Sequence, residues 1–380
     1  MIDEEILLVW ETSVPSNKNR TRYQRAKLLS TEYRCHAYVV GTIASDIESR
    51  FASTHVFPQT RILRPLFLPW VLILMTKHRF LDRNTIERIH TSPHSIAIII
   101  SMILKQFGVV WIQDIWDDPL LSVQIQRNKN DFISKVGRKY NKILYYLAKE
   151  NIESADLIIL GLHEGILDEM DIQTKNICSV TNGYSRVSPE KYRELSSPSI
   201  VYVGEIMSQR HIPELIESLG IVIKDFPDIE LNLIGPFGDD REEIETLIES
   251  IGIKDNVRIT GKIEHSEALK YIARSDIGVS LLSNDVRNYR YSYPIKTLEY
   301  MSLDSQIIVT ETPATCELLE PNTVFLSENT PEEIAAAIRE LLNEDRNNNF
   351  SWGSKMEEYS WEFINQKIIK CLSTLESDPY

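Results

Sequence analysis

Two cationic side chains stand at positions where a protein could bind a phosphate group. Arg210 comes shortly after the apolar stretch Ile200–Val203 and Gly204, and Lys296 lies near the start of the helical pattern Ile295–Met301. A turn that leads from a strand into a helix offers free N–H groups, and an arginine there adds a fork of donors. By itself, Arg210 is also typical of an exposed loop, so the assignment depends on its surroundings.

Lys296 and Glu299 belong to one segment, Ser292–Met301, in which Pro294 can open a helix. Residues three apart share a face of a helix, so the two side chains are expected near its first turn. The lysine could neutralise a diphosphate, and the glutamate could accept hydrogen bonds from a ribose diol. The alternative is an ordinary Lys–Glu ion pair on a helix surface, which contributes little to stability.

A third motif ends in a glycine that a planar ligand could approach. The strand pattern Val257–Ile259 leads to Gly261, and Lys262 and Ile263 follow. Because glycine has no side chain, a nucleotide base could lie close to the backbone at this point. A turn glycine without a ligand fits the sequence equally well.

A fourth candidate is Asp114, which follows the strand pattern Val109–Gln113. In an α/β protein the carboxyl ends of the strands face the ligand site, so Asp114 could contact a sugar or an acceptor hydroxyl. Aspartate also often caps a helix or forms an Asx turn, and the sequence leaves this alternative open.

Several motifs that would indicate other chemistry are missing from the sequence. We find no Gly-x-Gly-x-x-Gly fingerprint, no P-loop, no Asp-x-Asp triplet and no grouping of histidines at metal-ligand spacing. We therefore expect neither a cofactor nor a metal. If a diphosphate leaves during the reaction, protein cations and helix dipoles must stabilise it.

These candidates are positioned by short apolar runs that alternate with longer helical patterns in both halves of the chain. Strand, helix and strand in alternation indicate parallel βαβ units and hence an α/β fold. Strands are predicted at Ile6–Trp10, Ala37–Val40, Ile86–His90, Val109–Gln113, Asp156–Leu160, Asn176–Val180, Ile200–Val203, Glu230–Ile234, Val257–Ile259, Ile277–Leu281, Ile307–Val309 and Val324–Leu326. Helices are predicted at Tyr23–Ser30, Ser95–Phe107, Phe132–Ile152, Pro213–Asp225, Arg241–Ile251, Glu267–Arg274, Ile295–Met301, Pro331–Asn343 and about Lys355–Leu372.

The length of 380 residues predicts two domains. A linker without helical or strand periodicity runs over Tyr184–Ser199 and contains two prolines and several serines. We therefore place one Rossmann-like domain at 1–186 and another at 199–354, with two doubly wound sheets facing each other across a cleft. Such a cleft is a usual place for a ligand.

Charge is distributed unevenly along the chain. The net charge is −14, which argues against a general nucleic-acid binder. Residues 1–190 have 23 Lys and Arg against 21 Asp and Glu, whereas residues 191–380 have 18 against 34. Between residues 18 and 88 there are 13 basic and 5 acidic residues. A basic region of this kind can meet an anionic membrane or a phosphate.

One segment of this basic region also contains apolar residues and is a candidate for peripheral membrane contact. The equally weighted alternative is a helix packed in the core of the first domain with a solvated basic end. The cluster consists of Arg61, Arg64, Leu66, Phe67, Leu68, Trp70, Lys77, Arg79 and Arg83.

The cysteines and the apolar runs indicate the cellular compartment of the protein. The four cysteines lie far apart, which is typical of reduced thiols in a cytosolic protein. The N-terminus is acidic rather than basic, so no signal peptide is expected. The longest apolar run, Leu66–Met75, is about half the length that spans a bilayer. We expect a cytoplasmic protein, with any membrane contact at the inner face.

Taken together, these features resemble retaining glycosyltransferases of the GT-B fold, in glycosyltransferase family 4 (the group 1 transferases). The first half resembles the family at 155–159 and 180–183, and the start of the last helix resembles it at 359–361. The strongest resemblance is a series of motifs in the family's order: Val203-Gly204, Arg210, Leu233-Ile234-Gly235, Val257–Gly261, Ala273–Asp276 and Pro294–Met301.

The resemblance implies a function and a set of roles. The chain would move a sugar from a nucleoside-diphosphate sugar to a glycan or lipid-linked acceptor, with retention and without a metal. The first domain would bind the acceptor, the second would bind the donor, and a helix at about 355–380 would cross back to the first. Arg210 and Lys296 would face the diphosphate and Glu299 the ribose. The donor would also lie near Gly204, Gly261, Lys262, Ile263, Tyr291, Ser292 and Tyr293.

Two positions depart from the family pattern. Glu205 stands where the family usually has a basic residue, and Tyr291 stands where it often has a glutamate that contacts the donor sugar. These departures raise the question of whether the chain is active. The alternatives are a non-catalytic nucleotide-sugar-binding protein and a sugar epimerase of the GT-B fold. The sequence leaves open the base, the sugar, the acceptor and its linkage, and the oligomeric state.

Overall fold

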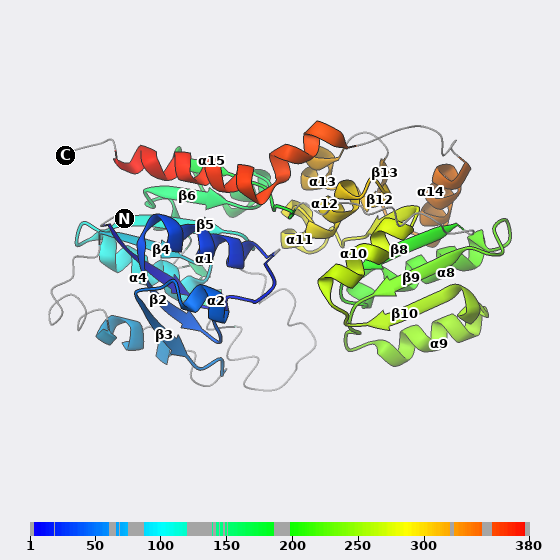
Figure 1. Cartoon of the computed structure of the whole chain (residues 1–380), viewed down its shortest axis with the longest axis horizontal. Coiled ribbons are helices and arrows are strands. Elements are labelled where there is room, and N and C mark those ends of the chain that lie inside the picture. Colours follow the sequence, from blue (N-terminus) through cyan, green and yellow to red (C-terminus); the bar gives the residue numbers. More distant parts are fainter. Residues whose placement is uncertain are drawn as a thin grey trace. The chain divides into compact units, whose positions relative to one another are not determined.

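The fold was analysed in a computed structural model of the chain. It describes residues 4–60, 66–74, 87–119, 139–185, 198–319, 323–343 and 352–376, apart from 19, 68, 140, 141, 144, 147, 148 and 150. The chain divides into two compact units, shown in Figure 1. Unit 1 consists of residues 1–181 and 361–380, and unit 2 consists of residues 182–360.

Unit 1 is built on a sheet of seven parallel strands in the order β3-β2-β1-β4-β5-β6-β7. Most strand residues are fully buried, as expected for parallel strands that helices cover on both faces. The strands are β1 (Glu5–Trp10), β2 (Arg34–Val40), β3 (Ser53–Phe57), β4 (Arg88–Thr91), β5 (Val110–Ile115), β6 (Leu157–Leu160) and β7 (Ile177–Ser179).

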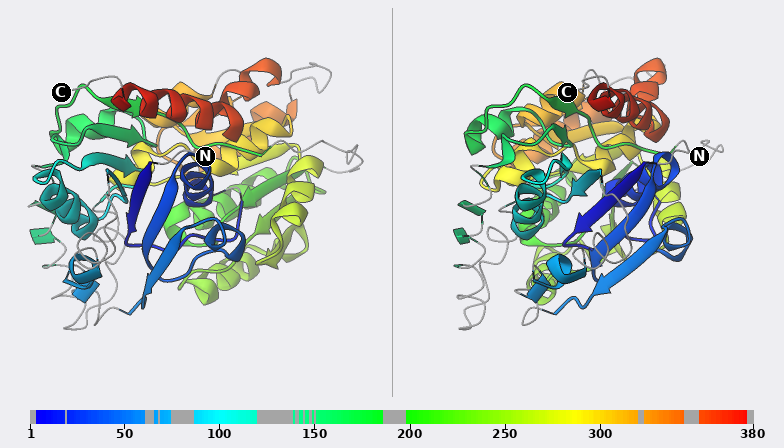
Figure 2. Two further views of the ribbon diagram at one scale, coloured as in Figure 1. Left: turned by 60° about the vertical axis from the view of Figure 1, so that its left-hand side comes forward. Right: turned by 90° about the vertical axis from the view of Figure 1, so that its left-hand side faces the viewer.

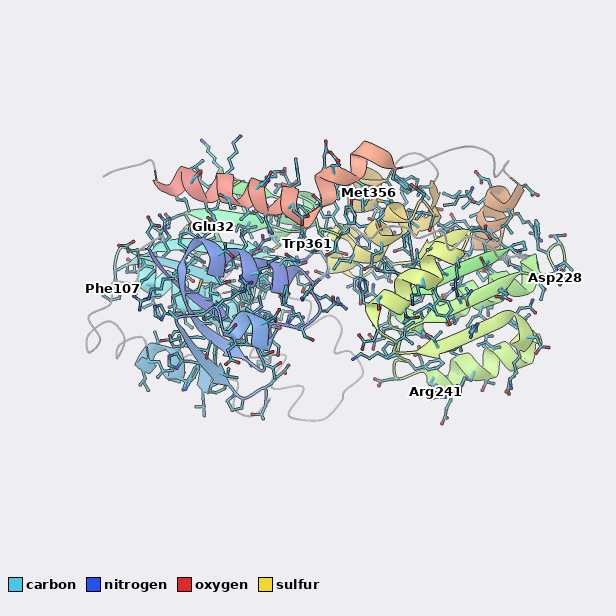
Figure 3. The ribbon with its side chains drawn as sticks, in the orientation of Figure 1. Glu32, Phe107, Asp228, Arg241, Met356 and Trp361 are labelled. Atoms are coloured by element: carbon cyan, nitrogen blue, oxygen red, sulfur yellow. The ribbon has the colours of Figure 1, made fainter. Side chains whose placement is uncertain are left out.

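The helices of unit 1 include one from the far end of the chain. Helix α15 (Trp361–Ser373) packs against β7 and α1, and Figure 2 shows it alongside the strands of this unit. Its apolar side chains, beginning with Trp361 (labelled in Figure 3), join one core with α1, α2 and the sheet. The other helices with bounds in unit 1 are α1 (Thr21–Glu32), α2 (Ser45–Glu48), α4 (Ser95–Lys105) and α7 (Gly165–Met170).

Unit 2 repeats the plan with six parallel strands in the order β10-β9-β8-β11-β12-β13. The strand order reverses between β8 and β11, and ligands in such sheets bind beyond the carboxyl ends of the strands at this point. The strands are β8 (Ser199–Val203), β9 (Glu230–Ile234), β10 (Val257–Gly261), β11 (Ile277–Ser280), β12 (Gln306–Thr310) and β13 (Thr323–Leu326).

Helices cover both faces of the unit 2 sheet and form two cores. Helices α8 (Ile212–Val222), α9 (Arg241–Ile251) and α14 (Pro331–Asn343) share one core. Helices α10 (His265–Arg274), α12 (Ile295–Ser302) and α13 (Pro313–Leu318) share the other. The remaining helical elements of unit 2 are α11 (Arg287–Tyr291) and the 3-10 segments η3 (Ser208–Arg210), η4 (Lys254–Asn256) and η5 (Gly353–Tyr359). One further 3-10 segment, η6 (Thr374–Glu376), belongs to unit 1.

The predicted α/β class and the two doubly wound parallel sheets are confirmed. All twelve predicted strands are present, with ends that differ by a few residues. The sequence analysis missed β3, an edge strand whose Ser53, Thr54 and His55 are only half-buried, because these polar residues give no apolar run. The predicted helix Phe132–Ile152 lies largely outside the described residues.

The segment that was a candidate for membrane contact is helical at 67–74, as far as it is described. Phe67 and Val71 are fully buried, and Trp70 packs on Phe57 and Tyr38. The basic residues Arg61, Arg64, Lys77, Arg79 and Arg83 and the apolar Leu68 lie outside the described residues. In the part of the chain that the structure covers, no helix is both long and apolar enough to cross a membrane.

Candidate functional site

The candidate site in unit 2 lies where strands β8 and β9 end in glycines. Gly204 N–H donates to the Ile234 carbonyl at 2.9 Å, which brings the two strand ends together. A Cβ atom at Gly235 would lie 1.9 Å from the Gly204 carbonyl oxygen, and Gly235 has a φ of +146°. Only glycine fits this position without moving the backbone, because a side chain would clash and a positive φ strains other residues.

Arg210 is the last residue of η3, directly before α8. Its guanidinium carbon lies 4.1 Å from the centre of the Tyr289 ring, so the cation stacks on an aromatic face. Tyr289 belongs to α11 and is buried. The aromatic ring holds the guanidinium in place while leaving its N–H donors to other partners.

Lys296 lies in the first turn of α12 and is partly buried. Its Nζ atom lies 4.2 Å from the centre of the Tyr202 ring, on β8. Burial lowers the pKa of Lys296 well below its usual value, and the positive charge of Arg210 lowers it further. Two residues far apart in the sequence are thus brought within electrostatic reach of each other, as a shared phosphate site would require.

This pair of cations has no carboxylate partner in the part of the chain that the structure describes. Within the ranges that the structure describes, neither Arg210 nor Lys296 forms an ion pair or a hydrogen bond with an acidic side chain. Two positive charges held close together repel each other, and the repulsion is relieved when an anion binds between them. The arrangement is therefore suited to a ligand with more than one negative charge, such as a diphosphate.

Glu299 lies one helical turn after Lys296 and is buried. Its carboxylate Oε1 is 2.7 Å from Nε2 of His265, at the start of α10. The Glu299 side chain is 8% exposed and that of His265 is 36% exposed. The sequence analysis missed His265, because a single histidine before a helix carries no spacing signal. A ligand at Glu299 would meet this histidine as well.

The segment from Gly261 to Ile263 connects β10 to α10. Gly261 has a φ of +69° and forms a backbone bridge with Gly235, so the ends of β8, β9 and β10 converge. Lys262 is exposed, and Ile263 is half-buried against the core of α10 and α12. The backbone here borders the same strand ends as Gly204.

The tyrosines of the segment Tyr291–Tyr293 are packed into unit 2. Both rings are buried, and the Tyr293 hydroxyl donates to Glu317 Oε2 at 2.6 Å. Ser292 is half-buried, and its hydroxyl lies 3.4 Å from the Tyr289 carbonyl. The Glu205 side chain is exposed. Contacts of this segment with a sugar stay a prediction.

Asp114 lies in unit 1, at the carboxyl end of β5, and is 0% exposed. Its Oδ2 atom forms a buried ion pair with Arg25 and lies 3.2 Å from Nε2 of His90. Nδ1 of His90 accepts a hydrogen bond from Trp10 at 3.0 Å, and burial lowers the pKa of His90. Asp114 has no exposed surface in this structure, and its environment is that of a structural ion pair. A contact of Asp114 with a sugar or an acceptor stays a prediction.

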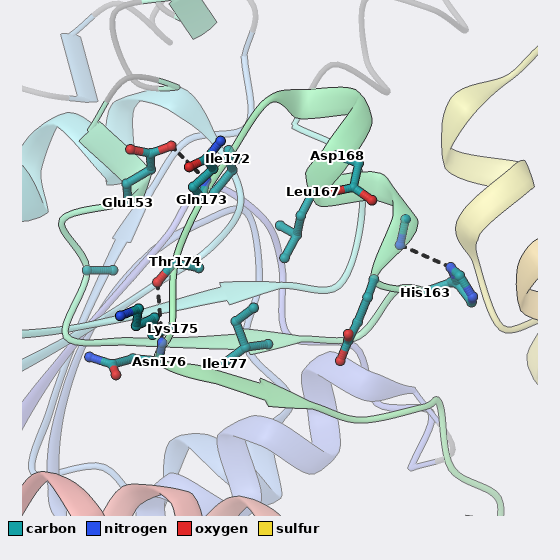
Figure 4. Close-up of a pocket in the computed structure, with 13 residues that line it drawn as sticks. Glu153, His163, Leu167, Asp168, Ile172, Gln173, Thr174, Lys175, Asn176 and Ile177 are labelled. Atoms are coloured by element: carbon teal, nitrogen blue, oxygen red, sulfur yellow. Dashed lines mark hydrogen bonds between the residues drawn. The ribbon is translucent and has the colours of Figure 1, made fainter.

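Unit 1 also has an open pocket of about 900 Å³ between β6, α7 and the turn before β7 (Figure 4). In this pocket Glu153 Oε1 accepts a hydrogen bond from the Gln173 backbone at 2.7 Å. His163 Nδ1 accepts one from Gly165 N–H at 3.1 Å. None of the predicted site residues lines this pocket.

Among the described residues, no group of three or more His, Cys, Asp or Glu side chains could hold a metal ion. The four cysteines are free thiols. A reaction independent of metal stays a prediction, because a donor can bring its own metal ion to such a site.

Comparison with known families shows that residues 187–359 match the profile of the family "Glycosyl transferases group 1". The matched residues make up nearly all of unit 2 and include every candidate site residue except Asp114. No curated protein sequence matches the chain.

Solved structures resemble the chain over almost its whole length. Sucrose-phosphate synthase from Thermosynechococcus elongatus has a TM-score of 0.70 at 16% identity, covering 98% of this chain and 99% of that chain. HepE from Anabaena, in complex with UDP and glucose, has a TM-score of 0.71 at 14% identity, covering 98% and 100%. The lipopolysaccharide outer core galactosyltransferase WaaB has a TM-score of 0.67 at 13% identity, covering 97% and 99%.

These structural similarities identify the fold of both units as that of GT-B glycosyltransferases. Together with the family match of residues 187–359, they support a glycosyltransferase.

Proposed function

We propose that the chain is a retaining glycosyltransferase that transfers a sugar from a nucleoside-diphosphate sugar to a glycan or lipid-linked acceptor. The observation that carries the proposal is the cation pair Arg210 and Lys296, stacked on two tyrosines and without an acidic partner among the described residues. It lies beyond the carboxyl ends of the strands in the unit that matches the group 1 family.

The proposed chemistry follows from where negative charge builds up. As the bond between the sugar and the diphosphate breaks, charge increases on the leaving phosphate, and the sugar becomes oxocarbenium-like. Arg210 and Lys296 stabilise that charge from fixed positions. We propose that they do so without a divalent metal, and that donor turnover is therefore unchanged by a chelator such as EDTA. Activity that disappears with the chelator and returns with Mg²⁺ or Mn²⁺ would contradict this part of the proposal.

Glu299 is proposed to accept hydrogen bonds from the ribose hydroxyls. Its Oε1 atom lies 2.7 Å from Nε2 of His265, so the ribose would share this carboxylate with the histidine. The backbone from Gly261 to Ile263 is proposed to border the base, because these residues follow β10 at the same converging strand ends. Under both assignments the nucleotide would bind in unit 2, near the converging ends of β8, β9 and β10.

The nucleotide is identified by a binding panel. Thermal-shift and calorimetric titrations with UDP, GDP and ADP, followed by their sugars, give the base and then the sugar. UDP is the first choice, because HepE was solved with UDP and with UDP-glucose. The best-bound donor is then incubated with the protein, and release of the nucleoside diphosphate is measured. Binding of none of the three nucleotides would contradict the proposal.

A second candidate function is a protein that binds a nucleotide sugar without transferring it. Two features favour it: Tyr291, at the position where the family resemblance implies a glutamate, is buried, and Glu205 is an exposed acidic residue directly after Gly204. The two functions differ in turnover. A donor that binds tightly but releases no nucleoside diphosphate, with or without acceptor mixtures, would support the second function and contradict the first.

The proposed acceptor is one presented at a membrane surface, with the protein located in the cytoplasm. Leu66 and Ile73, at the ends of the helical stretch that contains the buried Phe67 and Val71, are 54% and 68% exposed. Leu66 belongs to the basic and apolar sequence cluster, and Ile73 lies in the apolar run Leu66–Met75 within it. Such combinations of basic and apolar residues bind anionic lipid surfaces. Flotation with vesicles should rise with anionic lipid and fall with salt, and Ile73→Ser should weaken it. Failure to float at low salt on anionic vesicles would contradict membrane docking.

A further inference from the structure

Two of the free cysteines lie side by side in unit 1, although they are far apart in the sequence. Cys178 is in the middle of β7, and Cys371 is in the last turn of α15. Cys371 packs against the core that contains Cys178, and the Cys178 Sγ atom lies 3.9 Å from the carbonyl oxygen of Lys367, one helical turn before Cys371. Because α15 packs on β7, this contact is part of the interface that attaches the last helix to the unit 1 sheet.

The two thiols differ in access to solvent. Cys178 is buried, whereas Cys371 is partly exposed and lines an open groove of about 930 Å³. The groove lies at the amino-terminal ends of β5, β6 and β7, the edge opposite the one where ligands of such sheets usually bind. It is thus separate from the candidate donor site in unit 2, although it shares Lys175, Asn176 and Ile177 with the open pocket of Figure 4.

The groove is positively charged. Lys175 (labelled in Figure 4), Lys367 and Lys370 line it together with Cys371. Its one acidic lining residue, Asp156, is occupied by an ion pair with Lys105 and by the Trp111 backbone N–H at 2.8 Å. A small anion that enters the groove would therefore be attracted toward the Cys371 thiol.

We propose that Cys371 and Cys178 form a redox-sensitive thiol pair that reacts with an anionic low-molecular-weight disulfide, such as glutathione disulfide, bound in this groove. The Cys371 thiolate attacks one sulfur of that disulfide, forms a mixed disulfide and releases one thiolate. Cys178 then attacks the Cys371 sulfur, which forms the Cys178–Cys371 disulfide and releases the second thiol. The two protein thiols lose two electrons, which reduce the small disulfide to two thiols, and the Cys178 proton passes to the departing thiolate.

The order of the two steps follows from burial. Only a thiolate attacks a disulfide, and burial raises the pKa of the Cys178 thiol well above its usual value. Cys371, the thiol that borders the groove, therefore reacts first. Cys178 needs no access to solvent for the second step, because the Cys371 sulfur is already its neighbour. A disulfide bond is about 2 Å long, so joining the two sulfur atoms requires a local shift of α15 on β7.

The disulfide would covalently join β7 to α15 and enclose all of unit 2 within the closed loop of chain. The helix that returns from unit 2 to unit 1 would then be fixed to the sheet. Crosslinks that close long loops restrict the unfolded chain strongly, so oxidation should raise the thermal midpoint by roughly 5 °C or more. Oxidation would thus change the stability of unit 1 without a change at the candidate donor site.

The experiment uses the full chain incubated with glutathione disulfide, followed by alkylation and peptide mass spectrometry. The expected product is a peptide pair joined through Cys178 and Cys371, with a protein mass lower by two hydrogen atoms. Cys178→Ser should instead accumulate glutathione on Cys371, because the resolving thiol is missing. Cys371→Ser should leave Cys178 reduced. Cys316, which is exposed and in unit 2, serves as the internal control that the oxidant is active.

Two results would overturn the proposal. The first is a modified Cys316 beside an unmodified Cys178 and Cys371. The second is a stable mixed disulfide on Cys371 in the unaltered chain, because it would show that Cys178 does not resolve it. Circular dichroism of each variant confirms that the variant is folded before it is compared.

The role of the groove is tested separately with two small disulfides. A variant with both Lys367→Gln and Lys370→Gln should react several-fold more slowly with the anionic glutathione disulfide. Its rate with the neutral bis(2-hydroxyethyl) disulfide should be close to that of the unaltered chain. Equal rates for the variant and the unaltered chain with glutathione disulfide would overturn the proposed binding in the groove.

Discussion

The two units have sheets of the same strand order but treat positive charge differently at the carboxyl ends of their strands. In unit 1, Arg25 is buried beside β5 and is neutralised by Asp114, with His90 next to the same carboxylate. In unit 2, Arg210 and Lys296 lie near each other on aromatic rings, without an acidic partner among the described residues. The cation of unit 1 is thus neutralised within the fold, whereas we propose that the cations of unit 2 bind a ligand.

A buried or partly buried charge can thus have an opposite partner, as in unit 1, or lack one, as among the described residues of unit 2. A paired charge is part of the folded structure, and removing one partner leaves the other unsatisfied. Two like charges without an opposite charge nearby lower the stability of the free protein, and binding of an anion restores that stability. Substitutions in unit 1 should therefore act on folding, whereas substitutions in unit 2 should act on ligand binding and turnover.

The largest effect is expected for Asp114→Ala, which leaves Arg25 buried without its partner. The free energy of unfolding should fall by about 3–5 kcal/mol, as measured by chemical denaturation. The double variant with Arg25→Met and Asp114→Leu should recover most of this loss, because no buried charge remains. As a matched control, Glu245→Gln removes the exposed ion pair with Arg241 and should change stability little. A stable Asp114→Ala protein would show that unit 1 does not depend on the pair.

The second largest effect is expected on the turnover of two variants, Arg210→Ala and Lys296→Ala. Each should lower kcat by on the order of a hundredfold, because each removes a donor that stabilises charge on the leaving diphosphate. The KM for the donor should rise much less, since the diphosphate is already charged before the reaction and the other cation remains. Steady-state assays with the donor found in the binding panel measure both constants. Normal turnover in both variants would remove the cation pair from the mechanism.

A smaller effect is expected for Glu299→Gln, which keeps the shape of the side chain and removes its charge. The affinity for the preferred nucleoside diphosphate should fall about tenfold, the loss of one charged hydrogen bond. The corresponding 2′,3′-dideoxy nucleotide should bind the variant and the unaltered protein equally. Calorimetry measures the affinities for the ribose nucleotide and for the dideoxy nucleotide. An unchanged affinity for the ribose nucleotide would contradict the ribose assignment.

The smallest expected effect is that the affinity for the diphosphate depends on pH, because Lys296 titrates. Its pKa in the folded protein is lowered, by burial first and by Arg210 second, and a bound diphosphate raises it again. Between the lowered pKa and the usual value of about 10.4, binding takes up a proton, so the affinity should fall as the pH rises. In the same range the free protein should gain stability with rising pH, because the unfolded chain binds more protons. Lys296→Arg should remove the change in affinity, since arginine stays charged.

Much of the fold could be predicted from the sequence, because parallel strands are buried on both faces and read as short apolar runs. The edge strand β3 could not, since Ser53, Thr54 and His55 are polar and half-buried. In the site, the motif order placed Arg210 and Lys296 in one unit, but their stacking on Tyr289 and Tyr202 depends on contacts between distant elements. His265 beside Glu299 was missed for the same reason.

Asp114 shows that the position of a residue at a strand end does not by itself reveal its environment. It ends a strand on the side where ligands usually bind, as an active-site carboxylate would. Its environment depends on Arg25 from α1 and His90 from β4, and the sequence does not show that these side chains meet there. An active-site carboxylate and a structural ion pair differ in burial. The strand pattern does not reveal burial at the last residues of a strand.

The central claim is that Arg210 and Lys296 hold the diphosphate of the donor. The most direct test is calorimetric titration of the preferred nucleoside diphosphate and of its nucleoside monophosphate, with the unaltered protein, Arg210→Ala and Lys296→Ala. The ratio of the two Kd values isolates the terminal phosphate from the base and the ribose. We predict that the unaltered protein prefers the diphosphate strongly and that each variant loses most of this preference, because the terminal phosphate of the free diphosphate carries the additional charge that the donor gains only as the sugar departs. Variants that keep the same ratio as the unaltered protein would contradict the claim.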